Sequence, residues 1–514
     1  MMRNWQDSLR SLGHPRVVTM LFFGFSAGLP ILLIFSSLSL WLREAGVERS
    51  AVTFFSWAAL GYSFKFVWAP LVDRLPIPIL TKAFGRRRSW IIMAQVGIIT
   101  AILWMGFTNP ATGQHPLTIM AMAAVMLGFS SATQDIVIDA YRIESAQIDL
   151  QALMASTYIG GYRIGMLVAG AGTLFLADLF GSSKGNYRFE AWQNAYFIMA
   201  GFMLVGVITA ILVPEPEVNE VEEKTYASTD YLGSLLLFAL AAGGFILAFH
   251  FSADLGLDLK LRLTNWLNNK PLAGLLVEVF RLGLGLGVAS VIAKLFMATG
   301  FVNRQMVNAS YIAPVSDFFN RYGVFLAWLL LALVGLYRIS DIVLGVISNV
   351  FYQDLGFSKT EIASVVKTFG LFMTIAGGFL GGILSIRYGV IKILFVGALL
   401  SSLTNLLFML LAGMGHNLPM LYLVISADNL AGGLASAAFV AFLSSLTNIR
   451  FTAIQYAIFS SLMTLIPKVF GGYSGTLVDT LGYSSFFLIT AVIGIPVLIL
   501  VWLSGKYMGM KDPS

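Results

Sequence analysis

Long apolar stretches recur along the whole chain, and short polar or charged segments separate them. About 20 apolar residues in a helix cover the roughly 30 Å hydrocarbon core of a bilayer, so each stretch is long enough to span it. Six stretches come first, at 17–42, 51–73, 89–108, 116–141, 152–177 and 192–213. Six more follow later, at 324–347, 361–386, 391–413, 419–447, 451–478 and 484–504. Two others, 231–252 and 272–300, lie between the sets, which predicts about 14 transmembrane helices.

The order of six, two and six helices predicts three parts. We expect an N-terminal six-helix bundle over 1–213, a linker with two additional transmembrane helices over 214–323, and a C-terminal six-helix bundle over 324–514. A weak internal repeat supports this division, because a short turn with an acidic or polar residue follows the second and fifth helix of each bundle, as in "APLVDR" and "GTLVDTLG". Such repeats are typical of transporters built from duplicated helical units.

The composition supports a membrane protein and excludes several chemistries. Hydrophobic residues make up 58% of the chain and charged residues 11%, against about 25% charged residues in soluble proteins. We therefore expect an all-α polytopic membrane protein. The net charge of +6 is attributed to basic cytoplasmic loops rather than to nucleic-acid binding. No cysteine is present and the four histidines lack metal-ligand spacing, so no metal or cofactor is expected.

The distribution of Lys and Arg predicts the orientation of the chain. If the N-terminus is inside, the inside segments hold about twice as many Lys and Arg residues as the outside segments. The largest basic cluster, which includes "GRRR" at 85–88, then also falls inside. We therefore expect both termini to be cytoplasmic.

The segment "SSATQDIVIDAYR", residues 130–142, places charges at the end of an apolar helix. At about 100° per residue, Asp135, Asp139 and Arg142 fall within roughly 60° of one another. Ionisable groups at bilayer depth are costly and usually face an interior cavity. Because burial favours the protonated form of a lone carboxylate, Asp135 is the first candidate for a proton carrier. Asp139 and Arg142 are expected to form a gating pair near the cytoplasmic end; the alternative is a purely structural ion pair.

Other polar or aromatic residues within the predicted helices extend the candidate site. Asp428 is the next candidate for proton coupling. The candidates for substrate binding are Lys65, Gln134, Arg163, Lys367, Lys468, Trp57 and Tyr62. The excess of positive charge favours an anionic substrate, although Lys65 could instead reach the membrane interface. Arg338 and Asp341 are candidates for gating, unless they simply neutralise one another.

The loop after the second helix adds four gating candidates, namely Asp73, Arg74, Arg86 and Arg87. Together with Gly85 they resemble the loop motif of the major facilitator superfamily. Two features depart from that motif, since Ala69 stands where glycine is favoured and about ten residues separate "DR" from "GRRR".

Longer segments resemble one family within that superfamily. "GFSAGLP" (24–30), "FKFVWAPLVDR" (64–74), "TQDIVIDAYR" (133–142), "GYRIGMLV" (161–168), "VPEP" (213–216), "LYRISD" (336–341), "KTFGL" (367–371), "DNLAGGLASAAFVAFL" (428–443) and "TAIQYAIFSSL" (452–462) are similar to AmpG muropeptide permeases. The additional helix pair and Lys468, where arginine is expected, depart from the family pattern.

The resemblance implies a major facilitator fold and a function. It implies proton-driven import of anhydro-muropeptides, GlcNAc-1,6-anhydro-MurNAc with or without peptide, across the inner membrane of a Gram-negative bacterium for peptidoglycan recycling. The expected partners are this small-molecule substrate, protons and the lipid bilayer, with the chain acting as a monomer.

Three alternatives stay open. The chain could carry another bulky anion, such as acetyl-CoA. It could be a membrane enzyme acting on lipid-linked sugars, but the sequence has no His-Glu metal pattern or aspartate-rich metal loop, so we do not expect an enzyme. It could also be a receptor or scaffold built on a transporter fold.

Overall fold

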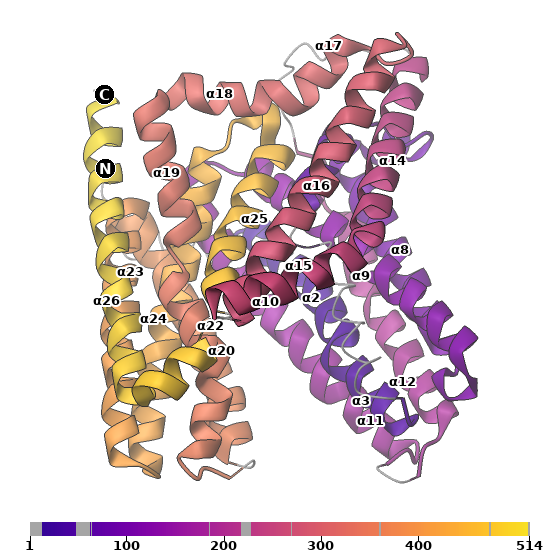
Figure 1. Ribbon diagram of the computed structural model, residues 1–514. Coiled ribbons are helices and arrows are strands. Elements are labelled where there is room, and N and C mark those ends of the chain that lie inside the picture. The colour runs from indigo at the N-terminus through magenta and orange to yellow at the C-terminus, as the bar shows by residue number, and fades with distance from the viewer. Residues whose placement is uncertain are drawn as a thin grey trace.

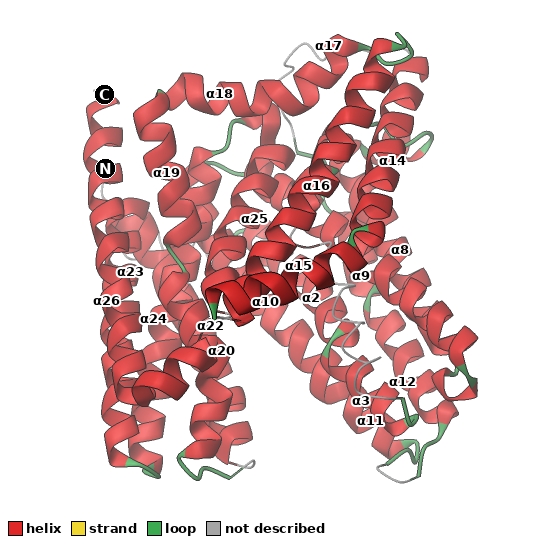
Figure 2. Ribbon diagram, viewed as in Figure 1, coloured by secondary structure: helices red, strands yellow, loops and turns green. Residues whose placement is uncertain are grey.

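The computed structural model describes residues 13–47, 62, 64–183, 186–216, 228–268, 270–358, 361–471 and 474–511. Within these residues the chain is helical, apart from turns and one isolated β-bridge between Ser183 and Asn186 (Figure 2). Among the described residues, 13 helical segments are long and apolar enough to cross a membrane. The predicted all-α architecture is therefore confirmed. Most of the expected helix 51–73 lies outside the described residues, including Trp57.

The N-terminal helices match five of the six predicted stretches. They are α2 (Pro15–Ile34), α3 (Ser36–Glu44), η3 (Lys65–Val67), α6 (Ala69–Arg74), α7 (Leu80–Phe84), α8 (Arg86–Phe107), η4 (Pro110–Thr112), α9 (Gln114–Ser145), α10 (Ile148–Leu167), η5 (Val168–Gly172), α11 (Thr173–Leu179), α12 (Phe189–Phe202) and α13 (Leu204–Leu212). We call this set the N-half.

The C-terminal set, which we call the C-half, is arranged in the same way. It consists of α19 (Val324–Leu336), α20 (Ile339–Asp354), η7 (Ile362–Phe369), α22 (Gly370–Tyr388), α23 (Val390–Met414), α24 (Leu418–Leu446), η8 (Ile449–Phe451), α25 (Thr452–Gly471) and α26 (Ser474–Lys511). The expected break between the last two stretches is present inside α26, where Gly482 has a φ of 77°. Glycine adopts this left-handed conformation without steric cost.

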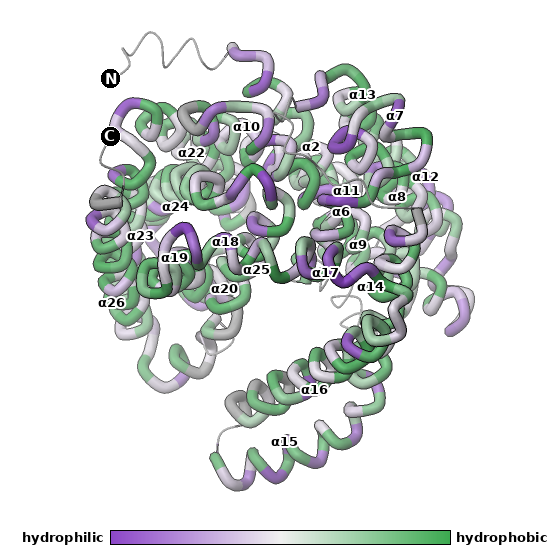
Figure 3. The backbone as a smooth tube through the Cα atoms, turned by 90° about the horizontal axis from the view of Figure 1, so that it is seen from above, coloured by the Kyte–Doolittle hydropathy of each residue, from purple (hydrophilic) through white to green (hydrophobic). Residues whose placement is uncertain are grey.

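The two additional helices between the halves are also confirmed, as α14 (Ser228–Phe251) and α16 (Lys270–Ala298). An amphipathic helix that the sequence pattern did not predict, α15 (Ala253–Leu267), joins them, and both α15 and α16 project away from the halves in Figure 3. Three short helices then lead into the C-half, namely α17 (Arg304–Val307), η6 (Asn308–Ile312) and α18 (Ala313–Tyr322).

The two halves contact each other mainly through α10, which packs against α22 and α24, and through α9, which packs against α25. Figure 1 shows α18 and the end of α26 at the top, which we call the upper end of the molecule. The helices α3, α11 and α12 of the N-half diverge from the C-half towards the opposite, lower end (Figure 1).

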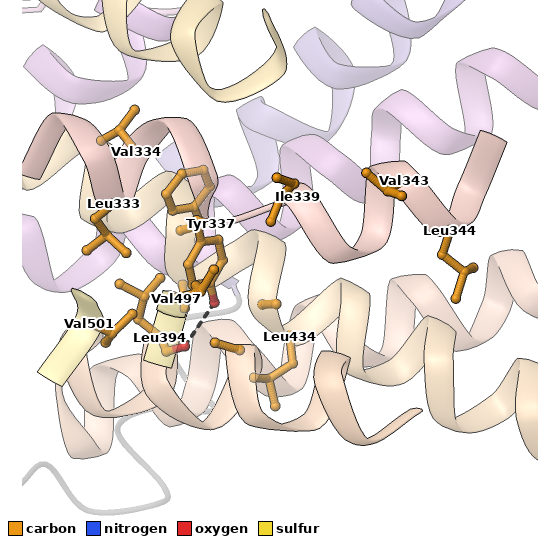
Figure 4. Close-up of a cluster of buried hydrophobic side chains, with 14 of the residues drawn as sticks. Leu333, Val334, Tyr337, Ile339, Val343, Leu344, Leu394, Leu434, Val497 and Val501 are labelled. Atoms are coloured by element: carbon orange, nitrogen blue, oxygen red, sulfur yellow. Dashed lines mark hydrogen bonds between the residues drawn. The ribbon is translucent and has the colours of Figure 1, made fainter. Parts of the chain in front are cut away.

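Several of the long helices are interrupted. The first helix of each half is broken, between α2 and α3 and between α19 and α20, and π-helical turns form η5 and η7. Helix breaks and π-turns in membrane proteins often mark functional sites. At the break in the C-half, the Tyr337 hydroxyl donates to the Leu394 carbonyl at 2.9 Å within an apolar cluster (Figure 4). This contact helps to fix the position of Arg338, the residue immediately before α20.

Glycines allow the closest helix pairs to form. A Cβ atom at Gly161 on α10 would lie 2.0 Å from the Leu21 carbonyl oxygen on α2, and one at Gly433 on α24 would lie 2.2 Å from the Thr374 carbonyl oxygen on α22. Both contacts are with backbone atoms, which cannot move aside as a flexible side chain can. Small residues therefore set the spacing of these helices, as is usual in membranes.

Neighbouring glycines on α24 allow a direct test of this spacing. We expect Gly433→Ala to lower the melting temperature of the purified protein, because overpacking typically costs about 1–3 kcal/mol. The matched control is Gly432→Ala, since a Cβ there meets no atom within 4 Å and alanine is the better helix former. Equal melting temperatures of the two variants would show that the α22–α24 contact does not limit stability.

Candidate functional site

The acidic stripe on α9 is in contact with a lysine from the segment before α6. The Lys65 Nζ lies 3.8 Å from one Asp139 oxygen, and Arg142 lies 3.4 Å from the other. Only 6% of Lys65 is exposed, so its amine stays inside the N-half rather than at the membrane interface. Asp139 therefore lies between two cations, which together compensate more than its own charge.

Asp135 lies one turn before Asp139 and has a different environment. The Tyr158 hydroxyl of α10 donates to its carboxylate at 3.3 Å, and Lys65 and Asp139 are both within electrostatic range. One turn before Asp135 on α9, the Ser131 hydroxyl accepts a hydrogen bond from the Tyr62 hydroxyl at 2.6 Å. Asp135 is thus less isolated than the sequence indicated, because Lys65 comes from a distant segment of the chain.

Arg142 connects the two halves near the upper end. Its guanidinium donates to the Gln151 side chain of α10 at 3.0 Å and to the Ser444 hydroxyl of α24 at 2.8 Å. It also lies 5.1 Å above the ring of Tyr456 on α25. Only 1% of Arg142 is exposed. A buried, charge-assisted contact of this kind stabilises the arrangement in which the halves meet at this end.

The loop between α6 and α8 closes on a buried ion-pair network. Arg87 donates to Asp73 at 2.7 Å and to the two oxygens of Glu144 at 2.5 and 2.8 Å. The neighbouring Arg86 donates to the Asp73 carbonyl at 3.2 Å, and Arg74 donates to the carbonyl of Ala309 in η6 at 3.0 Å. All four gating candidates of this loop are therefore held in place. Glu144, which sequence reasoning missed, lies two residues beyond Arg142.

A second acidic residue that sequence reasoning missed fixes the start of α8. The Glu215 carboxylate accepts hydrogen bonds from the backbone N–H groups of Arg87 and Arg88, at 2.6 and 3.1 Å. Carboxylates are favoured at helix N-termini, where such groups lack partners. Gly85 precedes this helix with a φ of 86°, and a Cβ there would lie 2.5 Å from the Glu215 carboxyl carbon. The glycine of "GRRR" is thus required both by its backbone and by Glu215.

Three cations from both halves gather where α10 and α22 pack. Arg163 on α10 and Lys367 in η7 are exposed, and each lies within electrostatic range of the other. Arg338, at the break between α19 and α20, is within range of Arg163. Among the described residues, none of the three forms a salt bridge. Like charges that converge without counter-ions make a site suited to an anion.

Two carboxylates of the C-half lie close to this cation group. Asp341, one turn into α20, is within electrostatic range of Arg338. Asp428 on α24 is within range of Asp341 and lies 3.3 Å from the Thr404 hydroxyl of α23. Arg338 and Asp341 are therefore near each other, but they do not form a salt bridge.

Three predicted substrate-binding residues are not placed in this site. Gln134 has no exposed surface and neither of its side-chain polar atoms has a partner, so in this conformation it does not contact solvent. Trp57 and the side chain of Lys468 lie outside the described parts of the chain. The roles assigned to these residues stay predictions.

Comparisons with known proteins agree with this architecture. The family model described as Major Facilitator Superfamily matches residues 17–344 and 329–513. A Rickettsia conorii protein named putative transporter AmpG 4 is 30% identical over 96% of this chain and 97% of its own length. The chain belongs to the AmpG family of the major facilitator superfamily. Another AmpG-type relative, the anhydromuropeptide permease of Escherichia coli K12, is 29% identical over 96% of this chain and 80% of its own length.

Solved structures show the same fold. The proton:xylose symporter XylE superposes with a TM-score of 0.57 at 13% identity, over 97% of this chain and 96% of that one. The transporter FucP in its outward conformation superposes with a TM-score of 0.58 at 11% identity, over 96% and 99%. This AmpG-family chain is therefore a multi-pass membrane transporter with a major facilitator fold.

The contact of Arg142 with the C-half leads to a test of conformation. We expect Arg142→Met to increase the population of molecules in which the halves separate at the upper end, because it removes the bond to Ser444. The chain has no cysteine, so spin labels can be attached selectively at Gln147→Cys in the N-half and Ile449→Cys in the C-half. Pulsed electron paramagnetic resonance then measures the distance between the two labels, which increases when the halves separate.

The matched control is Arg16→Met, which removes an exposed positive charge near the start of α2. It should leave the distance distribution unchanged. If Arg142→Met also leaves the distribution unchanged, the Arg142 contact does not hold the halves together.

Proposed function

We propose that this protein is a proton-driven importer of anhydro-muropeptides in the bacterial inner membrane. The observation that carries the proposal is the site at the junction of the halves, where exposed cations lie beside partly exposed carboxylates in a chain of the AmpG family. The anhydromuropeptide permease of Escherichia coli is among its relatives. Both termini would be cytoplasmic, and one chain would suffice for transport.

The cations would bind the carboxylates of the substrate. Arg163 belongs to the N-half, whereas Lys367 and Arg338 belong to the C-half. An anion held between them contacts both halves at once, and it offsets the repulsion of three like charges. Substrate binding would therefore draw the two halves together around the site.

The stripe on α9 would couple protons to this movement. Asp135 would carry the proton, since its only hydrogen-bond donor among the described residues is the Tyr158 hydroxyl. Asp139 and Arg142 would stabilise the state in which the upper end is closed, together with the network of Asp73, Arg87 and Glu144. When the halves separate there, water would reach the carboxylates and change their affinity for protons.

A carrier of another bulky anion, such as acetyl-CoA, is the second candidate. The three cations carry more positive charge than one substrate carboxylate can compensate. A polyphosphate carries several negative charges and would also bind to them. Competition distinguishes the two candidates, because unlabelled acetyl-CoA should not displace labelled anhydro-disaccharide if the protein is a muropeptide importer.

The cation group leads to a prediction on substrate affinity. We expect Arg163→Gln and Lys367→Gln to raise the KM for anhydro-muropeptide uptake by roughly 10- to 100-fold, since a hydrogen bond to a charged group contributes about 1.5–3 kcal/mol. Arg163 should be the more sensitive, because a guanidinium binds a carboxylate through two parallel bonds. Uptake of labelled GlcNAc-1,6-anhydro-MurNAc into membrane vesicles with an imposed proton gradient provides the measurement.

The control for this series is Arg262→Gln on α15, whose side chain is 76% exposed and paired with Asp258. It removes the same charge far from the junction of the halves and should leave the KM unchanged. Unaltered KM values for both Arg163→Gln and Lys367→Gln would contradict the proposed anion site.

The α9 stripe leads to a prediction on coupling. We expect Asp135→Asn to abolish accumulation of substrate against its gradient and to leave part of the exchange down the gradient, because the variant cannot release a proton. Asp139→Asn should slow both processes, since it weakens the gate pair. Both rates are measured in the same vesicles, with and without the proton gradient, and Asp258→Asn on α15 is the exposed control. Continued accumulation by the Asp135→Asn protein would assign the proton to another carboxylate.

A further inference from the structure

A second carboxylate pair lies in the C-half, outside the α9 stripe. Asp341 and Asp428 project from α20 and α24, and both are partly exposed. Each lies within electrostatic range of the other. Around them are the Thr404 and Ser401 hydroxyls of α23 and, further along α20, Tyr352.

The charges of this pair do not balance. Arg338 lies within range of Asp341, but the only charged group that acts on Asp428 among the described residues is Asp341 itself. Two ionised carboxylates and one guanidinium leave a net charge of about −1 in a region of low dielectric, where two unit charges interact far more strongly than in water. In contrast, Asp135 and Asp139 in the N-half are matched by Lys65 and Arg142.

Around Asp428, two acceptor groups lie within reach of a single hydroxyl donor. The Thr404 hydroxyl lies 3.0 Å from the Ser401 carbonyl and 3.3 Å from the Asp428 carboxylate. A hydroxyl has one proton, so it can donate to only one of these acceptors. When it donates to the nearer Ser401 carbonyl, it leaves the Asp428 oxygen without the Thr404 proton. A proton on Asp428, or a cation bound to both oxygens, resolves this conflict.

The Ser401 side chain on α23 points to the same conclusion. The Ser401 hydroxyl lies beside Asp341, is 7% exposed, and makes no hydrogen bond of acceptable geometry. Buried polar groups without partners are rare, because each costs about 1–3 kcal/mol. An occupied site next to α23 would remove part of this cost.

We propose that Asp341 and Asp428 form a cation site of the C-half, which binds one proton or one sodium ion with the Thr404 and Ser401 oxygens. Carboxylate and hydroxyl oxygens are hard ligands, so the site chemistry suits both ions. Binding of the cation is a property of the pair alone. A role of the cation in driving uptake rests in addition on the proposed transport function.

Arg338 links this site to the anion site. It is within electrostatic range of Asp341 on one side and of Arg163 on the other. A substrate carboxylate that pairs with Arg338 competes with Asp341 for its charge. The carboxylate pair is then less compensated and binds its cation more tightly, and by reciprocal linkage the cation favours substrate binding.

The binding test uses the purified full chain in lipid nanodiscs, without substrate. Infrared difference spectra between about pH 6 and about pH 9, a range in which ordinary exposed carboxyl groups stay ionised, should contain the carbonyl stretch of a protonated carboxylic acid, and Asp428→Asn should remove one such group per chain. In the sodium arm, replacing choline with sodium at constant ionic strength should raise the melting temperature of the wild-type protein but not of Asp428→Asn.

The arms separate the possible outcomes. A band that Asp428→Asn removes, without a sodium effect, assigns a proton; a sodium-dependent rise that Asp428→Asn abolishes assigns sodium. The control is Asp258→Asn on α15, which removes an exposed carboxylate and should change neither readout. If Asp428→Asn and Asp341→Asn match the wild type in both arms, the pair binds no cation and the proposal is wrong.

Coupling is tested separately in proteoliposomes. The substrate gradient that just balances an imposed membrane potential reports the number of charges moved per substrate, and Asp428→Asn should lower this number by one. If the number of charges moved per substrate is unchanged, the bound cation is structural and is not transported with the substrate. If the wild-type protein moves no anhydro-muropeptide at all, the proposed transport function fails while the cation-binding result still stands.

Discussion

Every ionised side chain at bilayer depth needs a counter-charge or water, and this requirement organises the centre of the molecule. Asp139 is held between Lys65 and Arg142, so three residues from two separate segments must meet for the charges to balance. The helices that carry them are then fixed relative to one another, because breaking a buried pair leaves an uncompensated charge. Glycines make the remaining spacing possible by letting α10 approach α2 until backbone atoms touch. The position of Tyr158 beside Asp135 follows from these two constraints together.

The same requirement explains how the halves are joined. Arg142 is bound to its own half through Asp139 and Gln151, and to the C-half through Ser444 and the ring of Tyr456. The contacts within its own half persist when the halves separate, whereas those with the C-half are lost. The contribution of Arg142 to the cost of opening the upper end is therefore a hydroxyl bond and a ring contact. Alternation between two states requires such an element with two arrangements of similar free energy.

The sequence predicted the features that depend on local spacing. Bilayer thickness sets helix length, so the apolar stretches were identified, and the helical angle of 100° per residue placed Asp135, Asp139 and Arg142 on one face. It did not predict α15, because leucines at 255, 257, 259, 261 and 263 alternate with period two, as in a strand. Nor did it predict that Glu144 binds Arg87 or that Glu215 begins α8, because residues 57 and 128 positions apart must meet through the fold. The conformation that buries Gln134 is likewise a property of packing.

The distribution of charge between the halves suggests why an anion and a cation would move together. The carboxylates of the N-half are balanced by Lys65 and Arg142. The C-half has a deficit of positive charge at Asp341 and Asp428, and beside it lies an excess formed by its own Lys367 and Arg338 together with Arg163 of the N-half. An anion bound alone would weaken the compensation of the carboxylates, and a cation bound alone would leave the three basic groups repelling one another. Occupation of both sites removes both imbalances, so the doubly loaded state is the one in which the charged centre is most easily closed off from water.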